Sequence, residues 1–266
     1  MYLKMRSPYS LYLVMAAALA FSLLSCGKKE ETTEKAPAVT PAAAPVDLAT
    51  VGSVSGTVKL DGPAPKPKKI NMAAEPSCAA IHASSPAFDE EVVEGEGGTL
   101  ANVVVYVKEG AGNRAFEPPK TPVTLDQKGC TYIPHVVALQ ASQPLDVINS
   151  DKTTHNIHPV PKNNREWNKS QPPGAPNIEE VFGREEVAIP VKCNVHPWMK
   201  SYIAVFKHPY FQVTKTNGSF ELKNLPAGTY TIEAWHEKYG TTSQTVTLAA
   251  KESKTVSFVF KAASGD

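Results

Sequence analysis

Hydrophobic residues alternate with polar ones along much of the chain, and no segment after the N-terminus shows a convincing helical period. Alternation at every second residue is the pattern of a strand with one buried face. The segment 54–60 alternates in this way and ends at an Asp-Gly turn signal, and further strands are predicted at 103–107, 136–139, 145–149, 187–192 and 202–207. Two polar, Pro-rich stretches, 63–99 and 159–178, are predicted to be irregular.

The C-terminal part is a series of alternating segments separated by clear turns. Asn217-Gly218 is a strong hairpin signal, and Tyr239-Gly240 marks a later turn. The alternating segments lie at 220–222, 229–235, 245–248 and 256–260. With 23 Pro and 16 Gly in 266 residues, the pattern predicts an all-β protein with many turns.

The N-terminus, residues 1–25, has the features of an export signal. Lys4 and Arg6 precede an apolar run from Leu11 to Leu24, which is too short to span a membrane comfortably. The run ends in Leu-Leu-Ser-Cys26-Gly, which resembles the lipobox of bacterial lipoproteins. That resemblance implies that Cys26 becomes the lipidated first residue of the mature protein. A secretory signal without lipidation is the alternative.

Residues 26–50 lack large apolar runs and are predicted to form a flexible tether. No later stretch is long and apolar enough to cross a membrane. We therefore expect a lipid-anchored protein in the periplasm or at the cell surface, with the outer membrane favoured, and hence an oxidising environment.

The charge balance narrows the choice of partners. The chain has 27 Lys and Arg against 26 Asp and Glu. Loss of Lys4 and Arg6 with the signal leaves 25 basic and 26 acidic residues, a net charge of −1. Nucleic acid is therefore not an expected partner, because binding to phosphates needs a basic surface.

The segment 216–240 carries a first family resemblance. Its sequence, TNGSFELKNLPAGTYTIEAWHEKYG, resembles carboxypeptidase regulatory-like (transthyretin-like) β-sandwich domains. The opening strands of that family match residues 54–58 and 101–105, far upstream. The resemblance implies one sandwich split into residues 51–118 and 209–266, with a second domain inserted at 119–208. Two or three consecutive small β units are the alternative.

Two short stretches carry candidate chemistry. Cys193, His196 and Met199 lie within seven residues between two predicted strands, and His155 lies in the run 149–158. Two His, one Cys and a weak axial Met are the ligand set of a type 1, or blue, copper site. Thiolate and thioether favour Cu(I), whereas imidazole suits both oxidation states.

These stretches resemble the cupredoxins over about residues 121–207, and the tight Cys-x2-His-Pro-aromatic-Met loop is similar to that of amicyanin. The resemblance implies a Greek-key β-sandwich with one copper ion. Its equatorial ligands would be His155, Cys193 and His196, its axial ligand Met199, and Asn156 would hold the Cys loop by hydrogen bonds. The chain departs from the family in having Ser142 in place of a usual Gly, Trp198 in place of Phe and a long polar segment at 159–186.

Other interpretations of the same residues remain open. Zinc could be held by four donors, His155, His158, Cys193 and His196, although Met199 favours copper because zinc rarely takes a thioether. Cys193 could also be a buried small side chain. Cys78 and Cys130 are expected to form a disulfide, and a second metal site with His82 and His135 is the alternative.

The expected function is one-electron transfer to and from an unidentified redox partner protein, without enzymatic catalysis. A multicopper oxidase is unlike this chain, because none of its seven His forms a His-x-His pair. Metal storage or delivery, or a structural surface-binding role, are the alternatives. We expect electrons to pass through an exposed edge of His196, beside a docking surface formed by Pro197 and Trp198. Alternatively, Trp198 packs under the loop.

Overall fold

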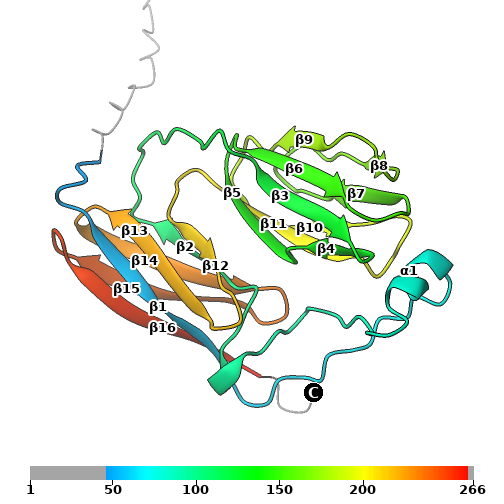
Figure 1. Cartoon of the computed structure of the whole chain (residues 1–266). Coiled ribbons are helices and arrows are strands. Elements are labelled where there is room, and N and C mark those ends of the chain that lie inside the picture. The colour runs from blue at the N-terminus through cyan, green and yellow to red at the C-terminus, as the bar shows by residue number, and fades with distance from the viewer. Residues whose placement is uncertain (1–45, 263–266) are drawn as a thin grey trace, which may run out of the picture. The chain divides into compact units, whose positions relative to one another are not determined.

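The computed structural model describes residues 46–262, which are built almost wholly of β-strands (Figure 1). The prediction of an all-β fold is confirmed. The export signal, Cys26 and most of the predicted tether lie outside the described residues. In the described part of the chain, no helix has both the length and the hydrophobicity needed to cross a membrane.

Strands from both ends of the described chain form one β-sandwich (Figure 1). One sheet has the order β13-β1-β16, with bounds Ser219–Leu225, Gly52–Asp61 and Ser253–Lys261. The other has the order β12-β2-β14-β15, with bounds Phe211–Val213, Val104–Glu109, Gly228–His236 and Gly240–Leu248. Because β1 lies between β13 and β16, antiparallel to the first and parallel to the second, strands from before and after β3 to β11 build this sandwich together.

The alternating residues of these strands form the core of the sandwich. Val54 and Val58 of β1 face Leu222, Ile232 and Phe258, and all five are buried. Burying a side chain of this size is worth about 1.5–3 kcal/mol. The alternation of hydrophobic and polar residues in the sequence therefore corresponds to one buried face on each strand.

The strands β3 to β11 form a second pair of sheets. One has the order β5-β11-β10-β7-β8, with bounds Val136–Gln140, Lys200–Phe206, Glu186–Lys192, His155–Pro159 and Lys169–Gln171. The other has the order β4-β3-β6-β9, with bounds Thr131–Ile133, Val123–Lys128, Pro144–Asn149 and Ile178–Val181. Leu125, Leu139, Val147, Ile157 and Ile203 are buried in their shared core.

The expected hairpin at Asn217-Gly218 is wrong. The tight turn is present, since the Gly218 N–H donates to the Lys215 carbonyl at 2.8 Å and Gly218 has a φ of +64°. The flanking strands, however, belong to different sheets, β12 pairing with β2 and β13 with β1. Pairing with strands far away in the sequence therefore overrides the local hairpin preference.

The stretch 159–178 is not wholly irregular, because it contains β8. This edge strand pairs with β7, and its Gln171 is buried among polar partners. The Gln171 side-chain amide donates to the Val147 carbonyl at 3.1 Å. A buried polar residue of this kind breaks the hydrophobic pattern on which strand prediction depends.

At Ser142, φ is +68°, a backbone conformation that favours the glycine usual there in cupredoxins.

The segment 63–99 runs from the end of β1 to the far side of the second pair of sheets (Figure 1). It contains a short helix, α1 (Pro76–Ile81), and the 3-10 turn η1 (Glu96–Gly98). Pro76 suits the first helical position, where its missing N–H would have no partner in the helix. A disulfide between Cys78 of α1 and Cys130 fastens the segment to the turn between β3 and β4.

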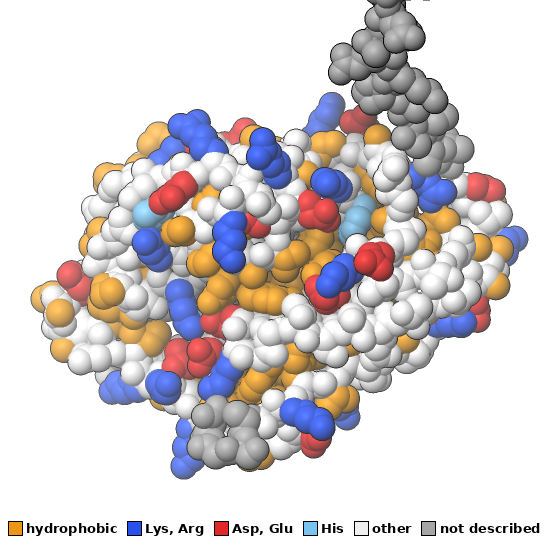
Figure 2. All heavy atoms as spheres, turned by 180° about the vertical axis from the view of Figure 1, so that it is seen from behind, with side chains coloured by type: hydrophobic (Ala, Val, Ile, Leu, Met, Phe, Trp, Pro, Cys, Tyr) orange, Lys and Arg blue, Asp and Glu red, His pale blue; other side chains and the backbone are white. Residues whose placement is uncertain are grey.

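The two pairs of sheets share an interface. Tyr106 of β2 packs against Phe206 of β11, with ring centroids 4.8 Å apart, and Val136 joins the same cluster. Beside it, the buried Glu237 pairs with His135 and accepts from Lys200 at 3.0 Å. Figure 2 shows one face of the molecule, on which hydrophobic side chains gather centrally among charged groups of both signs.

Candidate metal centre

Three of the predicted ligands converge on one buried point. His155 begins β7, Cys193 directly follows β10, and His196 lies in the loop that leads to β11. The two Nδ1 atoms of His155 and His196 are 3.0 Å apart, and the Cys193 Sγ lies 3.8 Å from the His196 Nδ1. One donor atom from each residue lies within 4.8 Å of the other two.

The ligand loop is closed by its own backbone. The Cys193 N–H donates to the Met199 carbonyl at 3.3 Å, and the Met199 N–H donates to the His196 carbonyl at 2.9 Å. The His196 N–H points at the Cys193 Sγ, 3.3 Å away. Met199 is buried in the same cluster as Cys193. The short loop therefore buries the thioether residue in the same cluster as the thiol donor.

Asn156 contacts the ligand loop through its side-chain amide. Its side-chain Oδ1 accepts from the Asn194 N–H at 3.0 Å, directly after Cys193. Its Nδ2 donates to the Lys169 carbonyl at 3.1 Å, and its own carbonyl accepts from the Tyr132 hydroxyl at 2.5 Å. One side chain thus ties the loop to β7 and β8.

Asp151 is a site residue that the sequence interpretation missed. Its Oδ2 lies 2.8 Å from the Nε2 of His155, on the side of the ring away from the convergent donors. The carboxylate also accepts from the N–H groups of Gly129 and Cys130, each at 2.7 Å. A carboxylate behind a ligating His fixes its tautomer and strengthens it as a donor. The available signal was an acid four residues before His155.

The surroundings favour an ionised thiol. Burial raises the pKa of the Cys193 thiol, but hydrogen bonds from His155 and from backbone N–H groups outweigh burial and lower the pKa. For His155, burial lowers the pKa, and hydrogen bonds to Asp151 and Cys193 raise it above its ordinary value. Burial and the neighbouring His155 lower the pKa of His196. Both directions favour the deprotonated form of Cys193 and the neutral form of His196.

The expectation that His196 reaches the surface is wrong. Its side chain is 0% exposed, and its Nε2 lies 3.6 Å from the Sγ of Cys78. The physical reason is the disulfide, which holds α1 against the ligand loop. Trp198 is half-buried, and its indole N–H donates to the Cys130 carbonyl at 3.0 Å. Pro197 is exposed, but no ligand edge is exposed beside it.

The alternative metal sites do not form. His158 turns away from the centre, with its Nε2 2.7 Å from Glu166, so the four-donor zinc set is not assembled. Cys78 and Cys130 are consumed by their disulfide and hold no second metal with His82. The Nε2 of His82 is 2.7 Å from the Gly129 carbonyl, and His135 pairs with Glu237.

The donor set suits copper. A thiolate and two imidazoles bonded to one ion at about 2.0–2.3 Å would lie about 3–4 Å apart, as the Nδ1 and Sγ atoms do here. The thioether of Met199 adds a second soft donor, which is foreign to a structural zinc site.

One family model matches part of the chain. Residues 206–261 match the family of carboxypeptidase regulatory-like domains. No match was found among curated proteins.

Three solved structures illustrate the structural likeness, all at low TM-score. A Cu-containing nitrite reductase from Thermus scotoductus SA-01 is 20% identical over 36% of this chain, with a TM-score of 0.30, and the chain spans 24% of that protein. A purple cupredoxin from Nitrosopumilus maritimus is 20% identical over 31% of this chain and 98% of its own, with a TM-score of 0.27. A Cu(I) amicyanin variant is 16% identical over 38% of this chain and 97% of its own, with a TM-score of 0.28.

Proposed function

We propose that this chain is a type 1 copper protein that carries single electrons. The observation that carries the proposal is the buried convergence of His155 Nδ1, His196 Nδ1 and Cys193 Sγ within 4.8 Å. His155, Cys193 and His196 would hold one copper ion, with Met199 as the axial donor. The bound metal would supply a one-electron couple.

The protein residues keep the donor positions nearly constant when the charge of the centre changes. Asn156 ties the loop after Cys193 to the neighbouring strand, and Asp151 holds the ring of His155 from behind. A centre whose ligands move little needs little reorganisation to gain or lose an electron. With four protein donors around it, the metal needs no substrate in its coordination sphere, so the proposed role is electron transfer rather than catalysis.

Burial of the donors favours electron transfer over metal delivery. The side chains of His155 and His196 are 0% exposed, and Cys193 is 3% exposed. A protein that hands metal to a partner needs a ligand that the partner can reach. The bound copper should therefore resist transfer to a soluble Cu(I) chelator for hours, whereas a delivery protein would release it within minutes.

The decisive experiment is the visible spectrum of the Cu(II)-loaded protein. We expect an intense blue or green colour from a charge-transfer band between sulfur and copper, and we expect Cys193→Ser to abolish this band. His158→Gln is the matched control and should keep the band, because His158 faces Glu166 rather than the centre. A colourless Cu(II)-loaded wild type would contradict the proposal and favour zinc.

We further propose that the protein is tethered to a membrane through a lipidated Cys26 and acts in the periplasm or at the cell surface. The disulfide between Cys78 and Cys130 supports an oxidising compartment, because such bonds are rare in the cytosol. Cys26→Ala in the full-length precursor should move the protein from the membrane fraction to the soluble fraction. A variant that stays in the membrane fraction would contradict the lipid anchor.

A further inference from the structure

The proposed function does not explain how electrons reach the buried metal centre. The edge of His196 is sealed by the disulfide of Cys78, and the far side of His155 is closed by Asp151. Electron tunnelling slows steeply with distance, so an outside molecule must still come close to some atom of the ligand loop. The described residues offer such an approach on the other side of the loop, at Trp198 and Met199.

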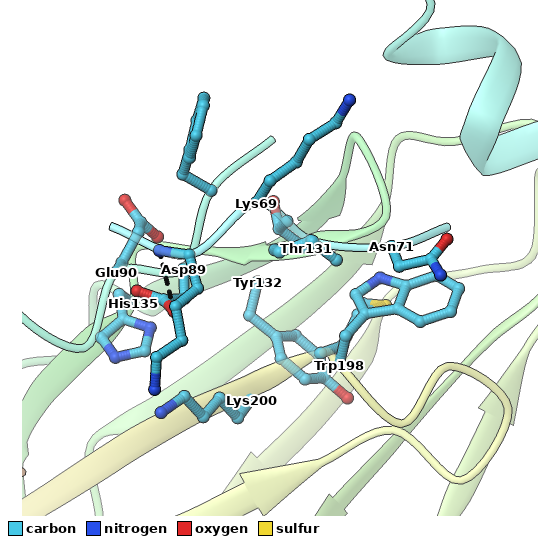
Figure 3. Close-up of a pocket in the computed structure, with 13 residues that line it drawn as sticks. Lys69, Asn71, Asp89, Glu90, Thr131, Tyr132, His135, Trp198 and Lys200 are labelled. Carbon is cyan, nitrogen blue, oxygen red and sulfur yellow. Dashed lines mark hydrogen bonds between the residues drawn. The ribbon is translucent and has the colours of Figure 1, made fainter. Parts of the chain in front are cut away.

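A pocket of about 230 Å³ lies there, between the segment 63–99 and the ligand loop. Ile70 and Phe88 of that segment line it, together with Tyr132, Trp198 and the predicted axial ligand Met199. Figure 3 shows Tyr132 and Trp198 close together in this pocket, with His135 farther along it. The ring of Trp198 is 5.2 Å from the ring of His196, centroid to centroid. An occupant would therefore touch one predicted ligand, Met199, and the ring of Trp198, which adjoins a second predicted ligand, His196.

The lining defines the chemistry of the occupant. Most of the wall surface is apolar, and Ile70, Phe88, Tyr132 and Trp198 contribute aliphatic and aromatic faces to it, which suits a flat ring. Sites for drug-sized ligands usually have about 300–1,000 Å³, so this smaller pocket suits a single ring. The charged residues that line it have both signs, with Lys68, Lys69 and Lys200 on one side of the balance and Asp89 and Glu90 on the other. Such a lining favours a neutral molecule with hydroxyl groups over an anion or a cation.

We propose that this pocket binds a neutral hydroxylated aromatic compound, a phenol or hydroquinone, as the electron donor to the centre. The proposal rests on the proposed copper function. The ring would give one electron to a Cu(II) ion held by the centre, and one O–H bond would break, with its proton passing to water at the open mouth of the pocket. The oxygen-centred radical then leaves, and a hydroquinone gives its second electron and proton to a second oxidised copper protein, which completes its conversion to the quinone.

Binding is tested first without copper, with phenol as the probe and the metal-free protein. Titration followed by NMR should show saturable shifts of the Trp198 indole N–H and the Thr131 amide, both in the pocket lining. Phe88→Ala removes one wall and should weaken binding at least fivefold. Phe88 is 50% exposed, so its loss should not unfold the protein. Ile81→Ala, at a 47% exposed position on the same segment but outside the pocket, is the control and should bind as wild type.

Electron transfer is tested next, by mixing the Cu(II) protein with hydroquinone and following the loss of colour. The rate should saturate with hydroquinone concentration, and Phe88→Ala should lower the rate constant at low concentration about tenfold without changing the copper spectrum. A linear rate that is equal in wild type and Phe88→Ala would overturn the proposal. A blue protein that does not bind phenol would overturn the pocket proposal alone. A protein that binds phenol but never turns blue would refute the copper function and the reducing role together.

Discussion

Removing the disulfide by the double change Cys78→Ala and Cys130→Ala should destabilise the protein and uncover His196. The bond closes a loop across a sequence separation of 52 residues. By the chain-entropy relation, a closed loop of that length restricts the unfolded state by about 4 kcal/mol at 25 °C. We therefore expect the free energy of unfolding to fall by about 4 kcal/mol.

Urea unfolding of the metal-free proteins, without reductant, measures this difference directly. Cys193→Ser in the same metal-free state is the control, because it removes a sulfur without opening a loop. A fall of less than about 1 kcal/mol would refute the chain-entropy argument and show that other contacts fasten the segment 63–99.

The same double variant tests how His196 is covered. In the wild type, the Cys78 sulfur lies 3.6 Å from the His196 Nε2, so diethyl pyrocarbonate should not modify this nitrogen. Without the disulfide, α1 is free to move away, and peptide mapping should find His196 modified at least ten times faster. Equal protection in both proteins would mean that packing alone seals the ligand edge.

Three further perturbations test the site and the sandwich separately. Asp151→Asn keeps the shape of the side chain but removes the charge behind His155, and it should weaken metal binding about 10–100-fold in a competition titration. Asn156→Ala removes the acceptor for the Asn194 N–H and should lower the free energy of unfolding by about 1–3 kcal/mol in urea. His236 is fully buried, and burial lowers its pKa to about 4. The folded protein favours the neutral form of His236, so above about pH 6.5 this group takes nothing from the free energy of unfolding. About 3 kcal/mol should be lost as the pH falls to about 4.

Each of these three predictions has a result that would contradict it. Unchanged metal affinity in Asp151→Asn would show that the carboxylate only supports the turn at Gly129. Wild-type stability in Asn156→Ala would show that the ligand loop is held by its internal hydrogen bonds. For His236, the control is His236→Phe, whose free energy of unfolding should change less between pH 6.5 and pH 4. Equal pH dependence in the two proteins would assign the loss to other groups.

The centre could be predicted from the sequence because its donors are local. Cys193, His196 and Met199 share one short loop, and their spacing alone limits where the side chains lie. His155 comes from a separate strand, but β7 pairs with β10 and thereby brings it to the loop. Asn156 follows His155 directly, so its position followed from the same pairing.

The cover over the centre could not be predicted in the same way. The segment 63–99 has no regular hydrophobic period, and nothing in its sequence indicates that it lies against a loop more than 90 residues later. The disulfide between Cys78 and Cys130 was expected, but its contact with the ring of His196 was not. The predicted hairpin at Asn217-Gly218 is wrong for a related reason, because the strands that flank this turn pair with strands that are distant in the sequence.

The parallel pairing of β1 with β16 has a consequence for the order of folding. The hydroxyls of Ser53 and Ser253 lie 3.0 Å apart although 200 residues separate them. The contiguous strands β3 to β11 form backbone pairs only with one another, so their two sheets are able to form while β1 still lacks both of its neighbours. Until the C-terminal strands are made, β1 presents two open edges, which are templates for aggregation. Mutations that delay synthesis or closure of the C-terminal strands should therefore lower the yield of soluble protein without changing the colour of the molecules that fold.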